Sequence, residues 1–332
     1  SGCTPVFAKA VVGRSASAPE ASALPPRRRS ARQRPRIGRH RPTAGILREG
    51  RTGGRSFAAE SKLNENVMEV KALFFDIDGT LVSFATHRMP RSAAEAVAAA
   101  RARGVRTFIA TGRMPSQVAV VGGLAFDGYI TCNGGCCFDG AWNVLGRTPL
   151  PGEDIRRLLA WLDAGHELTV TYMYEDRMTV NRNDEKVLAL MRQCGVETPV
   201  LRDPHDALHE PVYQASIFVG PDEERRLMRE LFPACVSSRW HPAFADINSR
   251  GCDKRTGMDT LLAHYGIPLA ATMAFGDGGN DIPMLRHAAV GVAMGEAAEA
   301  VRAAADHVAP AVDDDGIART LERYGVIDPR RP

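Results

Sequence analysis

From Met68 onward, short apolar runs alternate with longer segments in which apolar residues recur at helical spacing. KALFF and VRTFIA read as buried strands, and SAAEAVAAARARG between them predicts a helix that opens with a capping box, Ser92 and Glu95, and closes on Gly104. The same alternation of predicted helices and strands recurs late in the chain, in TGMDTLLAHYG, ATMAF, NDIPMLRHAA, VGVAM, EAAEAVRAAAD and DGIARTLERYG. Because helical crossovers join parallel neighbours, the pattern predicts a parallel sheet with helices on both faces.

The order of strand-like and helical segments changes between residues 150 and 249. Strand-like runs stand next to one another there, and helical patterns separate them: EDIRRLLAWLDA, LTVTYMY, RMTVN, DEKVLALMRQCG, QASIFVG, DEERRLMRELF, ACVSSRW and FADINS. Paired strands with a few helices are typical of an α+β unit with an antiparallel sheet. The sequence therefore predicts an α/β fold, a Rossmann-like core in two parts, 68–149 and 250–328, interrupted by an α+β cap at 150–249.

Residues 1–67 form a basic tail rich in Arg, Pro, Ser and Gly, without apolar periodicity. The tail carries 14 Lys or Arg and 4 Asp or Glu, a net charge of +10 against +3 for the whole chain, which leaves −7 for the rest. Such a composition predicts no packed unit. It is either sequence upstream of a start at Met68, or a targeting segment or RNA-binding arm. Because the basic charge is confined to the tail, we expect no nucleic-acid partner for the folded part.

Seven cysteines scattered over 332 residues are too few for a disulfide framework, so we expect a reducing, cytoplasmic setting. The cluster CNGGCC raises a metal hypothesis, but no second Cys or His pair at zinc spacing accompanies it, and small buried thiols are the favoured reading. No apolar run reaches the roughly 18 residues of a membrane span, so we expect no membrane association. No obligate protein partner is evident.

Four polar stretches follow predicted strands or open the helix after the cap: DIDGT, TGR, DKRTG and GDGGND. Ligands of parallel sheets bind outside the carboxyl ends of the strands. The stretches supply three carboxylates, a hydroxyl, a lysine and glycine-rich backbone, a set that suits phosphoryl transfer with a hard divalent cation such as Mg²⁺. Asp76 can attack phosphorus as a nucleophile, and Asp78 can protonate the leaving oxygen and then deprotonate a water. Gly79 permits the sharp turn, and Thr80 either orients Asp78 or caps a helix.

These motifs, in this order and spacing, resemble the haloacid dehalogenase superfamily, in particular its Cof-type branch with a large α/β cap. The resemblance covers residues 69 to about 327. It implies a phosphatase with Asp76 as nucleophile and Asp78 as acid and base. It also implies contacts of Thr111 and Lys254 with phosphoryl oxygens. The other implied residues are the Mg²⁺ ligands Asp76, Asp78 and Asp277 and the supporting Gly112, Asn280 and Asp281. Arg255 and Gly135 depart from common family residues without removing a reacting group.

The substrate side is less defined. Arg113 is expected to face the cap and touch substrate, and Asn133 either does so or stabilises a turn near the first core-to-cap crossing. Polar or aromatic candidates in the cap are Tyr172, Tyr174, Trp240 and His241, although a pair such as Trp240 and His241 fits packing on the cap sheet equally well. The branch implies small phosphorylated metabolites, and we expect hexose phosphates, with pyridoxal phosphate or flavin mononucleotide as alternatives.

Two other classes of function stay open. A phosphosugar mutase on the same scaffold needs extra anion-binding residues in the cap, for which Arg177, Arg182 and Arg239 are candidates. A catalytically idle binding module is disfavoured because the set of reacting groups is intact.

Overall fold

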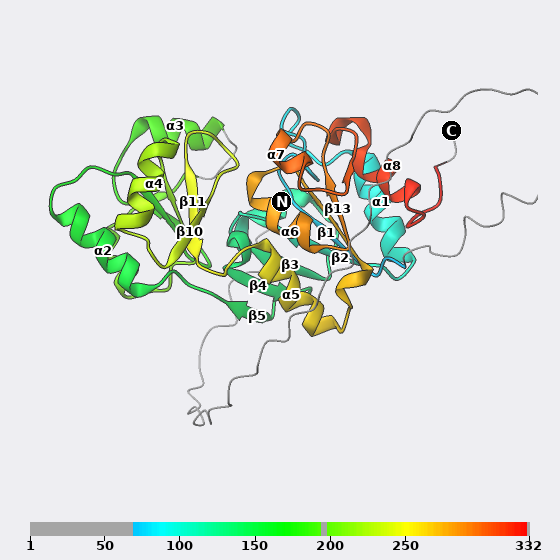
Figure 1. Cartoon of the computed structure of the whole chain (residues 1–332), viewed down its shortest axis with the longest axis horizontal. Helices are drawn as coiled ribbons and strands as arrows, with labels where there is room; N and C mark the ends of the chain where they lie inside the picture. The colour runs from blue at the N-terminus through cyan, green and yellow to red at the C-terminus, as the bar shows by residue number, and fades with distance from the viewer. Residues whose placement is uncertain (1–68, 194–197, 331–332) are drawn as a thin grey trace, which may run out of the picture. The chain divides into compact units, whose positions relative to one another are not determined.

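The computed structural model describes residues 69–193 and 198–330, and they form two sheets (Figure 1). One has eight strands in the order β14-β13-β12-β1-β2-β3-β4-β5, and the other has six in the order β10-β11-β9-β6-β7-β8. The predictions for the tail, Met68 and Cys194 concern positions outside the described residues. No helix in the described part of the chain is long and apolar enough to cross a membrane.

The eight-stranded sheet is the predicted core. Its strands are β1 Ala72–Phe75, β2 Arg106–Ala110, β3 Gly128–Thr131, β4 Cys136–Asp139, β5 Val144–Arg147, β12 Thr272–Gly276, β13 Val290–Ala293 and β14 His307–Val308. From β14 to β3 all neighbours pair in parallel, whereas β4 and β5 add an antiparallel edge. The α/β fold is therefore confirmed, and the antiparallel hairpin after β3 is an element that the sequence pattern did not predict.

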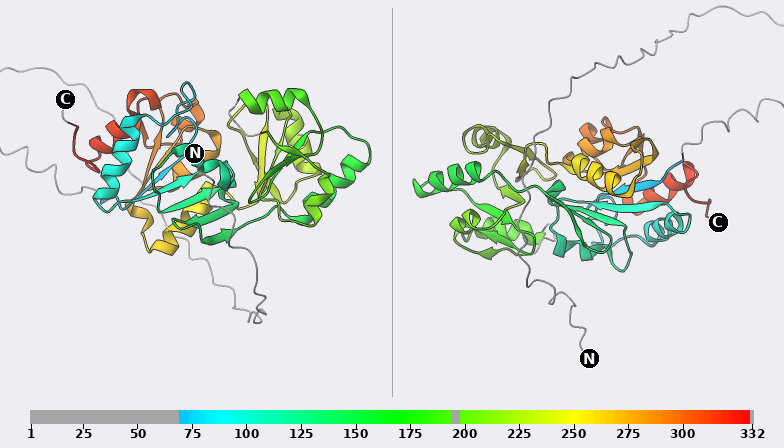
Figure 2. Two further views of the ribbon diagram at one scale, coloured as in Figure 1. Left: turned by 180° about the vertical axis from the view of Figure 1, so that it is seen from behind. Right: turned by 90° about the horizontal axis from the view of Figure 1, so that it is seen from below.

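Helices cover both faces of this sheet (Figure 2). They are α1 Arg91–Ala102, α5 Lys254–Tyr265, α6 Ile282–His287, α7 Glu299–Arg302 and α8 Gly316–Arg323. In β1, Leu73 and Phe75 pack with α1 and α8, while Phe74 packs with α5 and α6, as the alternation of side chains along a strand requires. The predicted capping box is wrong. Helix α1 begins at Arg91 with Pro90 as its N-cap, so Ser92 already lies inside the first turn.

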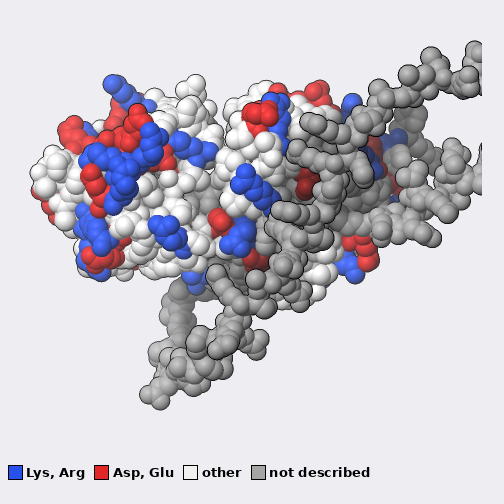
Figure 3. Space-filling model, in the orientation of Figure 1, with Lys and Arg blue, Asp and Glu red and all other residues white. Residues whose placement is uncertain are grey.

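The second sheet and its helices form the segment that we call the cap, from α2 to β11. Its elements are α2 Gly152–Asp163, β6 Val170–Met173, β7 Met178–Val180, α3 Glu185–Gln193, β8 Val200–Leu201, β9 Gln214–Ile217, α4 Pro221–Glu230, β10 Cys235–Ser238 and β11 Ala245–Ser249. All pairings except the parallel pair β7 and β8 are antiparallel, as the sequence predicted. On the surface of this region, basic and acidic side chains lie intermixed (Figure 3), and pairs such as Arg156 with Glu153 are one helical turn apart.

Alternation along β9 and β11 separates two faces of the cap sheet. Ala215, Ile217 and Ile247 pack in one cluster with apolar residues of α2 and α4. The residues between them point to the opposite face and are polar, namely Gln214, Ser216, Asp246 and Asn248. These four are also buried, which means that the polar face of the cap sheet is covered rather than open to water.

Short 3-10 helices connect the larger elements. They are η1 Pro115–Val121, η2 Cys132–Gly134, η3 Pro204–Leu208, η4 Leu269–Ala271, η5 Gly279–Asp281 and η6 Val312–Asp314. The cysteines Cys132, Cys136 and Cys137 at η2 and β4 are buried and free, which confirms the reading of CNGGCC as small buried thiols. The reducing compartment that we expect from the cysteines stays a prediction.

Candidate active site

The turn after β1 brings Asp76 and Asp78 to the carboxyl edge of the core sheet. The backbone N–H of Asp76 still donates to Phe275 O at 3.0 Å, so Asp76 continues the strand. Gly79 follows with φ +80°, and a Cβ at this position would lie 2.3 Å from Asp277 Oδ2. Two features therefore require glycine at position 79: the left-handed backbone conformation and the close approach of the Asp277 side chain. The hydroxyl of Thr80 donates to Asp277 Oδ1 at 3.0 Å, so both proposed roles for it, orienting Asp78 and capping a helix, are wrong.

Lys254 is the buried cation of the site. It begins α5, whose N-cap Asp253 accepts a hydrogen bond from Thr256 N at 2.9 Å. Its Nζ donates to Asp76 Oδ1 and to Asp281 Oδ1, both at 2.6 Å, and the side chain is 0% exposed. The other oxygen of Asp281 accepts from the backbone N–H groups of Asp277 and Gly278 at 3.0 and 2.9 Å. Asp281 therefore fixes the lysine to the loop that carries Asp277.

The carboxylates strongly perturb one another. Burial, with the charge of Asp281 next in size, raises the pKa of Asp76 to about 7 even though Lys254 opposes the shift. Burial and the charges of Asp76 and Asp281 likewise raise the pKa of Asp277 well above its usual range. Burial alone would lower the pKa of Lys254, but the two carboxylates outweigh it and raise that pKa. The cluster carries more negative charge than its single lysine neutralises.

This excess charge fits a divalent cation. Oxygens of Asp76, Asp277 and Asp281 lie within 4.8 Å of one another. Carboxylate oxygens are the ligands that Mg²⁺ prefers, and a cation here would relieve the repulsion that raises the carboxylate pKa values. The sequence predicted Asp76, Asp78 and Asp277 as ligands. The carboxylate of Asp78 does not belong to the group that the geometry brings together, whereas that of Asp281 does.

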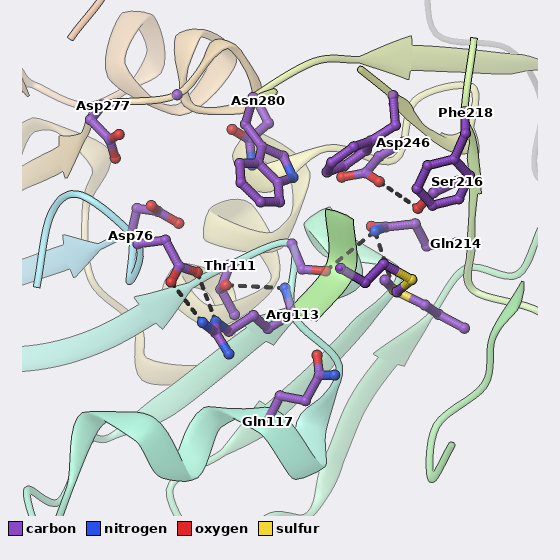
Figure 4. A pocket seen from close by; sticks show the side chains of 17 residues that line it. Asp76, Thr111, Arg113, Gln117, Gln214, Ser216, Phe218, Asp246, Asp277 and Asn280 are labelled. Carbon is purple, nitrogen blue, oxygen red and sulfur yellow. Dashed lines mark hydrogen bonds and ion pairs between the residues drawn. The ribbon is translucent and has the colours of Figure 1, made fainter. Parts of the chain in front are cut away.

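Asp78 is instead held by Arg113. Nε of Arg113 donates to Asp78 Oδ2 and its terminal nitrogen donates to Oδ1, both at 2.7 Å, which is a two-pronged ion pair (Figure 4). Thr111 precedes it at the end of β2, and its hydroxyl oxygen accepts from Arg113 N at 3.1 Å. Thr111, Asp76 and Asp78 line the same cavity. Arg113 was expected to touch substrate, and its guanidinium is already engaged by Asp78.

Asn133 connects residues that line the cavity from the cap and from the core. It adopts a left-handed conformation with φ 53°, its Nδ2 donates to Gln214 Oε1 at 2.9 Å, and its Oδ1 accepts from Asn280 Nδ2 at 3.0 Å. Gln214 also donates to the carbonyl of Gly112 at 3.3 Å. Asn133 does not itself line the cavity, but Gln214, Asn280 and Gly112 do. Its amide is therefore placed to hold cap and core residues in register.

The cavity holds about 750 Å³ of empty space, part of it open to solvent, and residues of both core and cap line it. The core contributes Asp76, Asp78, Thr111, Gly112, Arg113, Gln117, Asp277, Gly278 and Asn280. The cap contributes Met173, Met191, Gln214, Ser216, Phe218, Trp240, Phe244 and Asp246. Most of the cap residues were missed from sequence. The signal that could have found three of them is the alternation of polar and apolar residues in QASI and ADINS.

Of the four cap residues that the sequence suggested as substrate contacts, one lines the cavity. Trp240 lines the cavity, while His241 stacks on Phe244 at 5.5 Å between ring centroids and is not part of the wall. The expectation that Tyr172 and Tyr174 meet substrate is wrong, because both are buried in the apolar cluster under α2 and α4. They follow the apolar phase of their strand, as their neighbour Val170 does.

The cap arginines that motivated the mutase alternative are paired elsewhere. Arg177 binds Asp176 and Glu210, Arg182 binds Glu167, and Arg239 binds Glu224 and three backbone carbonyls. Among the described residues that line the cavity, Arg113 is the one Lys or Arg. The described part of the cap offers no second cationic subsite on this wall.

Comparisons with known proteins agree with this geometry. A family model described as haloacid dehalogenase-like hydrolase matches residues 73–321. The chain is similar to the solved HAD subclass IIB sugar phosphatase BT4131, with 41% identity and a TM-score of 0.73, over 78% of this chain and 100% of that one. BT1666, a phosphatase from Bacteroides thetaiotaomicron, is 32% identical with a TM-score of 0.74, over 81% and 100%. The HMP-PP phosphatase of Escherichia coli is 27% identical over 70% of this chain and 87% of its own length.

Proposed function

Because the chain belongs to the haloacid dehalogenase-like hydrolases, we propose that it is a Mg²⁺-dependent phosphomonoester hydrolase that works through an aspartyl-phosphate. Family membership makes it a phosphatase of small phosphorylated molecules. The observation that carries the mechanism is the convergence of Asp76, Asp78, Thr111 and Lys254 beside the acidic cluster. The domain boundaries that we propose are the predicted ones, near residues 150 and 249.

Asp76 is the nucleophile. Lys254 holds its Oδ1, which fixes the carboxylate plane at the strand tip and favours the ionised form that attack requires. A carboxylate oxygen forms a bond to phosphorus while the bond from phosphorus to the leaving oxygen breaks. Water then attacks the same phosphorus and releases inorganic phosphate and the free carboxylate. Thr111, at the cavity wall, donates its hydroxyl hydrogen to a phosphoryl oxygen.

Asp78 moves the proton in both steps. It gives a proton to the leaving oxygen in the first step and takes one from the attacking water in the second. In the structure both of its oxygens are occupied by Arg113, so acid and base work requires that one of these bonds be exchanged for the reacting oxygen. Arg113 is accordingly a positioning residue that keeps Asp78 near the site between turnovers.

Asp76, Asp277 and Asp281 form the acidic cluster beside which Mg²⁺ would bind. Bound there, the ion would offset the charge of the carboxylates and of the phosphoryl group that must approach them. Thr80 orients Asp277 and Lys254 orients Asp76, which leaves one carboxylate oxygen of each residue for a cation. Both oxygens of Asp281 already accept hydrogen bonds, from Lys254 and from the backbone of the Asp277 loop, so Asp281 supports the site mainly by its charge and by holding Lys254. Chelation and add-back of Mg²⁺, followed by phosphate release, tests the requirement directly.

We further propose hexose phosphates as substrates, with pyridoxal phosphate and flavin mononucleotide as alternatives. The similarity to a sugar phosphatase supports the choice of hexose phosphates. The similarity to an HMP-PP phosphatase is the reason to test the two alternatives, whose phosphates are attached to molecules with flat nitrogen-containing rings. A panel of phosphate esters, each reported as kcat/KM for phosphate release, decides the matter. If nucleotides or phosphopeptides exceed every hexose phosphate by about tenfold, roughly 1.4 kcal/mol, the substrate proposal is wrong while the reaction class survives.

Hydrolysis is favoured over the mutase alternative. A mutase must hold a second phosphate, and the cap arginines that could do so are committed to acidic partners outside the cavity. Incubation with glucose 1-phosphate separates the two: a hydrolase releases inorganic phosphate, whereas a mutase yields glucose 6-phosphate.

A further inference from the structure

The cap places one buried carboxylate on the cavity wall that no step of the proposed chemistry uses. Asp246 lies in β11, is 2% exposed, and faces the cavity from the side opposite to the core motifs. Its neighbours in the strand, Ala245 and Ile247, point into the apolar cluster of the cap, so strand alternation fixes the direction of the carboxylate. A group that is costly to bury and aimed into a ligand cavity calls for a partner.

The partners within the protein satisfy Asp246 only in part. Ser216 Oγ donates to its Oδ1 at 2.7 Å. Burial raises its pKa to about 6, and hydrogen bonding from Ser216, Trp240 and Asn133 together with the charge of Lys254 opposes the shift. An ionised carboxylate offers about four acceptor sites on its two oxygens. Three internal donors therefore leave about one acceptor site for a donor that enters the cavity.

An aromatic wall stands next to this carboxylate. Trp240 and Phe244 both line the cavity and pack edge to face at 5.0 Å between ring centroids, and the ring centroid of Phe218 lies 5.5 Å from that of Phe244. A charged acceptor beside an aromatic face suits a molecule that presents hydroxyl donors on its edge and C–H groups on its face. A pyranose ring has both features.

Resting on the proposed function, we propose that Asp246 is the specificity-determining residue of the cap, which accepts a hydrogen bond from one hydroxyl group of a sugar leaving group while Trp240 covers the ring. Ser216 holds the carboxylate in position for this contact. The other end of the substrate, its phosphate, lies at Asp76 on the core side. Selection of the leaving group is thereby separated in space from the chemistry.

The test compares Asp246→Asn with the wild type on two substrates. Glucose 6-phosphate has hydroxyl donors, and acetyl phosphate has none on its leaving group. We expect kcat/KM for glucose 6-phosphate to fall about 10- to 100-fold in the variant, since a hydrogen bond to a charged group is lost, and that for acetyl phosphate to stay within about twofold. Asp222→Asn, an exposed cap residue on α4, is the matched control and should change neither value.

A series of monodeoxy hexose phosphates completes the test without relying on the fold of a variant. At one ring position, loss of the hydroxyl should lower wild-type kcat/KM and cause no further loss in Asp246→Asn. Equal losses on both substrates, no loss on glucose 6-phosphate, or no such ring position would overturn the inference. So would a wild type that hydrolyses acetyl phosphate but no hexose phosphate. A wild type that hydrolyses neither would instead refute the proposed function.

Discussion

Replacing Lys254 with methionine tests whether one buried cation holds the acidic cluster together. Methionine keeps most of the volume and removes the charge, so Asp76 and Asp281 lose the ammonium that lies 2.6 Å from each. Removing one partner of a buried ion pair costs about 3–5 kcal/mol. We expect a value near the lower end, because Asp76, with its pKa already raised to about 7, can take up a proton in place of the lost counter-charge.

The assay is thermal unfolding with chelator and with Mg²⁺, together with phosphate release. A domain of this size loses about 2–4 °C in Tm per kcal/mol, so the metal-free variant should melt about 6–12 °C below the wild type. Mg²⁺ should restore part of the loss, and turnover should fall at least about 100-fold because Asp76 loses the ammonium that orients its carboxylate and favours its ionised form. Lys186→Met, at an exposed position of α3, is the control. A metal-free Tm within about 2 °C of wild type, with turnover intact, would refute the reasoning.

Four further outcomes are expected. Asp76→Asn should abolish phosphate release and keep the fold by circular dichroism, while EDTA should silence the wild type reversibly; near-normal turnover of the variant, with deamidation excluded, would contradict the nucleophile assignment. Asp78→Asn should slow both burst and steady-state phases, and a normal rate in either would contradict its double role. In the metal-free protein the raised pKa of Asp76 stabilises the fold below about pH 4, and this contribution is lost as pH rises to about 7. Mg²⁺ affinity, measured by calorimetry, should correspondingly fall as pH drops below about 7, and a pH-independent affinity would exclude proton release. Deletion of residues 1–67 should leave Tm and activity nearly unchanged, and a large drop would show that the tail contributes to the fold.

The core of the site could be predicted because it depends on topology rather than on side-chain packing. Asp76 follows β1, Thr111 follows β2 and Asp277 follows β12, and these three strands are adjacent and parallel. Parallel strands bring their carboxyl ends to one edge, so strand assignment and motif order were enough to bring these residues together. The antiparallel hairpin after β3 escaped prediction, since its short runs CCFD and VLGR carry no clear period.

Partners of individual side chains were harder to predict than positions. Thr80 sits two residues from Asp78, yet its hydroxyl reaches Asp277, nearly two hundred positions away in the chain. Arg113 was expected to contact substrate, and it pairs with Asp78. Each group has several partners within reach once the loops converge, and the choice among them depends on loop geometry that local sequence does not encode.

In the cap, the sequence pattern does not tell whether a polar residue of an amphipathic strand faces water or a buried cavity. Alternation in QASI and ADINS correctly separates Ala215 and Ile247 from Ser216 and Asp246. Read alone, such a pattern indicates one face on a core and one face in water. Here the polar face is buried as well, because the core motifs lie across the cavity from it. Asp246 is a buried acceptor only because of where the fold places the cap strand that carries it. The reaction could therefore be predicted from contiguous motifs, whereas the choice of substrate depends on residues that acquire their surroundings only in the folded chain.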